Sequence, residues 1–198
     1  MNKQWLKLVL FVLVMALMVV AAPGLSRPAA ALSSDIVISQ VYGGGGNAGA
    51  TYTNDFVELF NRGTSAVSVN GWSLQYASST GTSWTNKTDL PNATLQPGQY
   101  FLVQLSSGGA NGVALPASDH TGSINMSGSA GKIALMSTTT VIANGTICPS
   151  SSVVDLVGFG PATNCSETAP TTPNLTATTA AIRGGSGCTE TDNNSSDF

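Results

Sequence analysis

The sequence contains few of the side chains on which most enzymes depend. Charged residues occupy only 9% of the 198 positions, and there is a single histidine, His120. A Ser-His-Asp or Cys-His site, or a histidine-based metal centre, needs that ring together with further partners or ligands. His120 stands instead in a short polar stretch, Ser118–Gly122, whose composition is typical of a turn. We therefore predict that the protein is not an enzyme and holds no cofactor.

Long apolar runs are also missing, with one exception at the N-terminus. Lys3 and Lys7 flank the start of an uninterrupted apolar stretch, Leu8–Ala22, and Ala29–Ala31 offers small side chains at the spacing that signal peptidase accepts. The competing interpretation, a membrane anchor, would need about 20 apolar residues. We predict a signal peptide over residues 1–31, a mature chain that begins at Leu32, and a secreted, extracellular protein without a membrane anchor after cleavage.

Basic side chains become scarcer still once the leader is removed. Loss of Lys3, Lys7 and Arg27 leaves four basic and ten acidic side chains, a net charge of −6. Tight binding to a phosphate backbone needs clustered Lys and Arg. The chain is therefore predicted not to bind nucleic acid, and its partner is expected to be an unidentified protein or a surface glycan.

Helical periodicity is absent after the leader, and short β-type runs take its place. Turn signals such as Asn70-Gly71 and Pro97-Gly98 separate runs of β-branched and aromatic residues. Residues 32–198 are enough for one domain, and many short strands without helices predict a sandwich or barrel. The polar, proline-interrupted stretch between Pro161 and Thr179 is predicted to be a surface excursion. The predicted strands are Ile36–Val41, Asp55–Phe60, Ala66–Val69, Trp72–Tyr76, Tyr100–Gln104, Lys132–Met136, Val153–Val157 and Ala180–Arg183.

Six motifs together resemble one known family. They are DIVISQVYGGGGNAGATYTNDFVELFN (35–61), GWSLQYAS (71–78), LQPGQYFLVQ (95–104), MSGSAGKIALM (126–136), VVDLVGFG (153–160) and TDNNSSDF (191–198). As a set they resemble the lamin tail domain of secreted bacterial proteins. The resemblance implies an all-β, immunoglobulin-like β-sandwich that acts as a non-catalytic binding, adhesion or spacer module. In such relatives the domain often precedes a metal-dependent nuclease domain of the exonuclease–endonuclease–phosphatase type. The alternative is thus an N-terminal accessory domain of a truncated extracellular nuclease.

The first of these motifs carries a glycine run and two carboxylates. Gly43–Gly46 lacks the Gly-Lys-Ser/Thr ending of a phosphate loop, so we predict a mobile loop between strands. Asp55 and Glu58 are three residues apart on a strand, which directs them to opposite faces and argues against a catalytic pair. The family resemblance places these acidic residues in the sandwich pattern, and Glu58 is interpreted as a carboxylate bonded by backbone or arginine partners.

Two aromatic residues define a third functional hypothesis, a carbohydrate-binding module. Trp84 lies in the polar segment TGTSWTNKT, and Tyr76 is close to it in the sequence. An exposed aromatic ring stacks on sugar rings, whereas a ring that covers a sheet edge is commoner. The hypothesis requires Trp84 and Tyr76 to be exposed together.

The C-terminus is rich in oxygen ligands. Asp192, Asn193, Asn194 and Asp197, with Glu190 before them, form a candidate calcium site, although the EF-hand spacing is absent. Asx side chains more often bond their own backbone in turns.

Three cysteines remain in the exported chain. An oxidising compartment favours one disulfide and leaves one thiol free. If the strands Val153–Val157 and Ala180–Arg183 are antiparallel neighbours, Cys148 and Cys188 meet at their outer ends, and this is the preferred pair. If these strands are parallel or lie in different sheets, Cys165 takes part in the bond instead.

Overall fold

A computed structural model describes residues 35–198. The predicted signal peptide, residues 1–31, and the predicted mature terminus at Leu32 lie outside the described residues. Among residues 35–198, no helix has the length and apolar character needed to cross a membrane.

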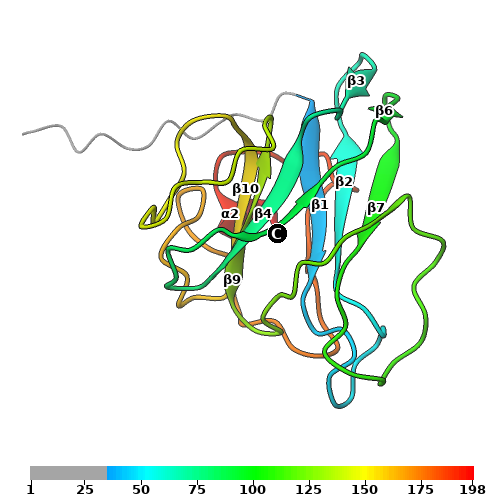
Figure 1. The fold of residues 1–198 in the computed structure, drawn as a ribbon, viewed down its shortest axis with the longest axis vertical. Helices are drawn as coiled ribbons and strands as arrows, with labels where there is room; N and C mark the ends of the chain where they lie inside the picture. The colour runs from blue at the N-terminus through cyan, green and yellow to red at the C-terminus, as the bar shows by residue number, and fades with distance from the viewer. Residues whose placement is uncertain (1–34) are drawn as a thin grey trace, which may run out of the picture.

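Two β-sheets, one of five strands and one of four, face each other (Figure 1). All strand pairs are antiparallel except β7 with β8, which is parallel, and the C-terminus ends in a single helical turn. The first sheet has the order β11 (Ala181–Ile182), β1 (Ile36–Tyr42), β2 (Phe56–Asn61), β7 (Tyr100–Gln104) and β8 (His120–Thr121). The second has the order β10 (Val153–Phe159), β9 (Gly131–Met136), β4 (Ser73–Ser78) and β5 (Asn86–Asp89). A small ribbon pairs β3 (Val67–Ser68) with β6 (Thr94–Leu95), and α2 is Asn194–Asp197.

The main hydrophobic core fills the space between the two sheets. Alternate residues of each strand point inward, as the period of two requires. On β1 the alternation changes phase at an irregularity between Ile38 and Gln40, so that Ile38 and Val41 both belong to the core. The inward residues Leu59 of β2 and Ile133 of β9 are fully buried in the same cluster. The architecture is therefore the predicted all-β, immunoglobulin-like sandwich.

A second hydrophobic cluster covers the outer face of the four-stranded sheet. Trp84, Met136, Leu156 and Cys165 belong to it, and the connection between β9 and β10 and the segment after β10 contribute to the covering. Every residue of β9 is buried for this reason. The sheet is thus covered on both faces, which the sequence motifs did not indicate.

Each of the eight predicted strands corresponds to a strand of the structure, with ends that agree or are shifted by one or two residues. The strands β5, β6 and β8 were not predicted, since they are short and largely polar. His120 is therefore not in a turn: it lies in β8, and its Nε2 is 3.0 Å from the carbonyl oxygen of Asp89.

Two predictions about loops are wrong. Gly43–Gly46 is buried, and a Cβ atom on Gly45 would lie 2.1 Å from the carbonyl carbon of Asn54, so this segment is packed where only glycine fits. The stretch 161–179 is not merely a surface excursion. It contributes buried residues such as Glu167, and Thr171 forms a bridge with Phe159 of β10.

Candidate functional site

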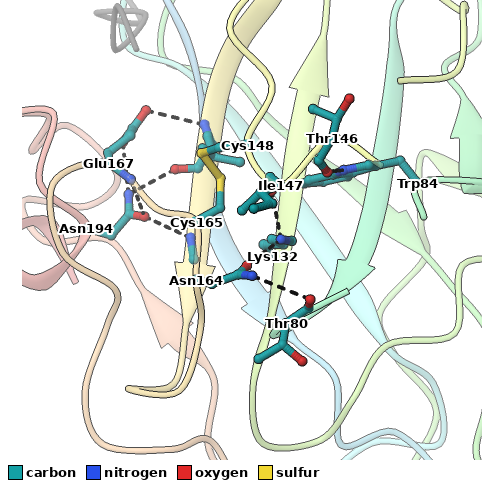
Figure 2. The surroundings of a disulfide bond; sticks show 12 residues. Thr80, Trp84, Lys132, Thr146, Ile147, Cys148, Asn164, Cys165, Glu167 and Asn194 are labelled. Atoms are coloured by element: carbon teal, nitrogen blue, oxygen red, sulfur yellow. Dashed lines mark hydrogen bonds between the residues drawn. A yellow bond between two sulfur atoms is a disulfide. The ribbon is translucent and has the colours of Figure 1, made fainter. Parts of the chain in front are cut away.

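The disulfide of the structure joins Cys148 to Cys165, with Cα atoms 5.3 Å apart (Figure 2). The preferred pairing of Cys148 with Cys188 is wrong, and the alternative partner, Cys165, is the one bonded. The reason is that β10 and β11 lie in different sheets and are not neighbours. Cys188 is an exposed free thiol. The bond ties the connection between β9 and β10 to the segment that follows β10.

A buried lysine lies beside this disulfide. Lys132 points to the outer face of β9, is fully buried, and donates from Nζ to the carbonyl oxygen of Ile147 at 2.8 Å and to Asn164 Oδ1 at 2.6 Å. Its ammonium group is 5.4 Å from the centroid of the Trp84 ring. Figure 2 shows the two side chains near the disulfide. Burial lowers the pKa of Lys132. The group acts as a structural cation that bonds two loops to the sheet.

The aromatic residues of the carbohydrate hypothesis are not available to a sugar. Trp84 is 0% exposed, and its Nε1 donates to the carbonyl oxygen of Thr146 at 2.8 Å. Tyr76 is 6% exposed and belongs to the main core, where its hydroxyl accepts a hydrogen bond from the Ser127 amide. The condition of the carbohydrate hypothesis, that both rings are exposed together, is not met, because the connection between β9 and β10 packs over Trp84 and Tyr76 lies in the main core.

Asp55 and Glu58 point to opposite faces, as predicted. Asp55 is buried toward the core and accepts hydrogen bonds from the amides of Gly45 and Met126, both at 2.9 Å. Burial raises the pKa of Asp55 to about 6, against the two amide hydrogen bonds. Glu58 is half-buried on the outer face and accepts from Ser39 Oγ, which differs from the expected backbone or arginine partners. Asp55 therefore holds two loops together.

The centre of the candidate site is the fully buried guanidinium of Arg183, directly after β11. The strand β11 pairs with β1 only at Gln40 and Val41. Beyond that point Arg183 Nε donates to the carbonyl oxygen of Ile38 at 2.9 Å, and Asp155 Oδ2 accepts from the Ile38 amide at 2.5 Å. Arg183 Nη2 and Asp155 Oδ2 form an ion pair at 2.9 Å. This pair takes the place of the missing strand along β1 and joins the two sheets.

The other terminal nitrogen of Arg183 binds the C-terminal residues. Nη1 is 2.6 Å from Glu190 Oε2 and 3.4 Å from Asp197 Oδ2, and the side chains of both ion pairs are fully buried. The guanidinium also lies 4.6 Å from the centroid of the Phe198 ring. One cation thus connects β1, β10 and the last residues of the chain.

Four carboxylates, those of Asp155, Glu167, Glu190 and Asp197, gather around this single cation. Burial, and then the charges of Asp155 and Glu190, raise the pKa of Glu167 to about 10. Burial also raises the pKa of Asp155, which Arg183 opposes, and burial raises that of Glu190. The Glu167 side chain is therefore protonated at neutral pH, which reduces the excess negative charge that the cluster buries.

The cluster offers a cation site only in competition with Arg183. Oxygens of Asp155, Glu167 and Glu190 lie within 4.8 Å of one another, a donor set that suits a hard metal ion. Arg183 already neutralises two of these side chains through direct ion pairs. The arrangement is that of a buried ion-pair network that holds segments together, and its residues are bonded to each other more than they are open to a substrate.

Of the residues of the calcium hypothesis, Asp197 belongs to this cluster through its ion pair with Arg183, and Asn194 contacts it through Glu167. Asn194 Oδ1 accepts from the Gly158 amide at 2.8 Å, and Asp197 Oδ1 accepts from Thr191 Oγ1 at 2.7 Å. Asn193 Oδ1 accepts from a serine hydroxyl, and Oδ1 of Asp192 is a buried oxygen without a hydrogen-bond partner. Calcium binding by this set stays a prediction.

Sequence reasoning did not identify Asp155, Glu167 or Arg183 as parts of one site. A signal was present in the motif VVDLVGF, where one carboxylate interrupts an otherwise uncharged strand. A lone charge inside such a run indicates a buried, paired group. Its partner could not be named, because Arg183 lies 28 positions away.

An open hollow of about 450 Å³ lies in the connection between β9 and β10. Its lining residues all come from positions 136–152 of the described chain, carry no charge, and include Met136, Thr140, Val141 and Pro149. The hollow lies on the outer side of the four-stranded sheet. It shares Met136 and Cys148 with the second hydrophobic cluster.

The comparisons with known proteins agree with this architecture. The family model described as Lamin Tail Domain matches residues 29–159, which end at the last residue of β10. No curated protein matches the chain. The segment 160–198, with Cys165, Glu167 and Arg183, follows the matched region. Because the model matches more than half of the sequence, the chain belongs to the lamin tail domain family, whose fold is a non-catalytic immunoglobulin-like domain.

Proposed function

We propose that this protein is exported and works outside the cell as a non-catalytic lamin tail module that binds a protein partner or acts as a spacer. The observation that supports the proposal most directly is the Cys148–Cys165 disulfide. Disulfides persist in oxidising compartments and are rare in the cytosol. This bond, together with the leader-like sequence at residues 1–31, favours export.

The chemistry of the buried charges supports a structural rather than a catalytic role. The buried charged side chains form hydrogen bonds with backbone groups of loops and strands of the same chain, as Arg183, Lys132 and Asp55 do. A catalytic group needs a free reactive atom within reach of a substrate. The hypothesis of a glycan partner depended on exposed aromatic rings, and Trp84 and Tyr76 are buried. A place beside a nuclease domain remains an alternative that none of these contacts favours.

The test is to express the whole chain, leader included, in a secreting bacterial host and to assay the culture medium. We expect the protein in the medium, without hydrolysis of DNA or of phosphate esters in the presence of Mg²⁺, Mn²⁺ or Ca²⁺, and without a gel shift of DNA. Metal-dependent DNA cleavage that is lost on a single substitution in this chain would overturn the non-catalytic assignment. Retention of the full-length chain in the cytoplasm would overturn export.

A further inference from the structure

The outer face of the five-stranded sheet is covered by segments of its own chain at both ends of the strands. At one end the turn 184–188 packs on the face, where a Cβ atom on Gly187 would lie 3.1 Å from a ring carbon of Phe60. At the other end Tyr42 Oη donates to the carbonyl oxygen of Ala177 at 2.6 Å. Between these two covered ends, one row of side chains crosses the sheet from strand to strand.

This row, which we call the central row, follows from the strand register. Gln40 of β1 lies between Ile182 of β11 and Glu58 of β2. Leu102 of β7 is the next partner of Glu58, and the Leu102 amide donates to Asp119 Oδ2 at 2.8 Å, just before β8. Ile182 is 57% exposed, Asp119 is exposed, and the other three side chains are half-buried. The part of the chain that the structure describes therefore leaves the central row accessible.

Two carboxylates of the central row lie on either side of an apolar side chain. Glu58 Oε1 accepts from Ser39 Oγ at 2.7 Å and from Gln40 Nε2 at 3.0 Å. Within residues 35–198, neither Glu58 nor Asp119 forms an ion pair. Neighbouring strands are about 4.8 Å apart, so these two residues, with β7 between them, are about 10 Å apart. Leu102 lies between them, and the row thus presents negative charge beside apolar surface.

The charge and spacing of the central row decide which partner fits it. A second copy of the chain would bring like charges together across the contact, which is unfavourable, whereas lysine or arginine side chains complement the carboxylates. In an α-helix, residues seven positions apart are about 10.5 Å apart along one face. In an extended segment, residues on one side are about 7 or about 14 Å apart. The separation of Glu58 and Asp119 therefore favours a helix that lies across the strands.

We propose that the central row docks a positively charged amphipathic helix of another protein. Two basic side chains of this helix, seven residues apart, bind Glu58 and Asp119, and the apolar side chains between them pack on Leu102. An apolar side chain seven residues before the first basic one contacts Ile182, the exposed end of the row. The inference rests on the proposed function as a module that binds a protein partner, and it names the surface and the chemistry of that partner.

The test titrates the disulfide-bonded protein at low salt with a synthetic, alanine-based helical peptide. The peptide has two lysines seven residues apart, two leucines midway between them, and one leucine seven residues before the first lysine. A peptide of the same composition in shuffled order is the control ligand. The first peptide should bind in a saturable manner, and it should shift the backbone amide NMR signals of Glu58 and Leu102 more than those of the four-stranded sheet.

Matched substitutions separate the central row from the overall negative charge. Glu58→Gln keeps the acceptor for its neighbours and should weaken peptide binding about 2- to 5-fold. Asp89→Asn removes an exposed carboxylate on β5, in the other sheet, and should leave binding unchanged. Ile182→Ser should also weaken binding, whereas Ile147→Ser, at a similarly exposed side chain after β9, should not. If E58Q fails to fold, Asp119→Asn takes its place with the same expected loss.

Four results would overturn the proposal. They are the absence of saturable binding at low salt, equally tight binding of the shuffled peptide, equal weakening in E58Q and D89N, and a dimer in light scattering whose contact covers the central row. Each of them removes this docking surface and leaves the export and the lack of catalysis untouched. Those two are tested by the culture-medium assay, where metal-dependent DNA cleavage or cytoplasmic retention would contradict the proposed function without affecting peptide binding.

Discussion

Replacement of Glu167 by glutamine should make the stability of the protein less dependent on pH. Glu167 is 3% exposed, and burial, followed by the charges of Asp155 and Glu190, raises its pKa from 4.5 to about 10. In the folded protein at neutral pH this side chain is a neutral acid. Glutamine has nearly the same shape and no charge, so the substitution should be tolerated near pH 7.

The direction of the effect follows from proton binding. The pKa of Glu167 is higher in the folded protein than in the unfolded chain, so the folded state binds this proton more tightly. The resulting stabilisation is fully present below about pH 4.5 and is lost as the pH rises toward about 10. One such proton changes the free energy of unfolding by about 1.4 kcal/mol per pH unit. From about pH 7 to about pH 9 the wild-type protein should thus lose roughly 2–3 kcal/mol through this group.

Urea unfolding at pH 7, 8 and 9 measures the difference directly. The free energy of unfolding of E167Q should fall less steeply with pH than that of the wild type, and the two lines should diverge by about 1.4 kcal/mol per unit. Glu58→Gln, on the outer face of β2, is the control and should run parallel to the wild type. Parallel lines for wild type and E167Q would refute the reasoning, as would a loss of more than about 3 kcal/mol in E167Q at pH 7, the cost of breaking a buried charged pair.

Four further substitutions test other parts of the structure. Arg183→Met should lower the free energy of unfolding by about 3–5 kcal/mol in urea, because it leaves buried carboxylates without their cation; a change below about 1 kcal/mol would contradict the role of this network. Cys165→Ser should cost about 3 kcal/mol through loss of a bond with a sequence separation of 17, whereas Cys188→Ser should leave the thermal midpoint unchanged. Trp84→Ala should cost about 3–5 kcal/mol because it empties a buried site, and glycan-array binding that disappears in folded W84A would restore the carbohydrate hypothesis.

Local sequence patterns were sufficient for the parts of the fold that depend on local alternation. The alternation around Ile36 and the short apolar runs around Phe56 and Ile133 were enough to indicate strands, and the family motifs indicated how such strands assemble. The polar strand Asn86–Asp89 has no such pattern, because it is held by its neighbour β4 rather than by burial of an apolar face. Glycines 43–46 were interpreted as a mobile loop because the backbone segments that pack against them are distant in the sequence, so no local pattern indicates their burial.

The candidate site was less predictable because it depends on which sheet each strand joins. Cys148 pairs with Cys165 rather than Cys188 because β10 and β11 belong to different sheets, a fact that spacing does not contain. Trp84 stands in a polar segment and is nevertheless buried, since loop 137–152 folds over it. Arg183 could be recognised as a charge near a strand, but its partners Asp155 and Asp197 come together only in the folded chain.

The most direct test of the account is non-reducing peptide mapping and intact mass analysis of the protein recovered from the culture medium of a secreting host. We expect a chain that begins at Leu32, a bond between Cys148 and Cys165, and one thiol, that of Cys188, open to alkylation without reduction. Three alkylatable thiols in the folded protein, or a bond that contains Cys188, would contradict it.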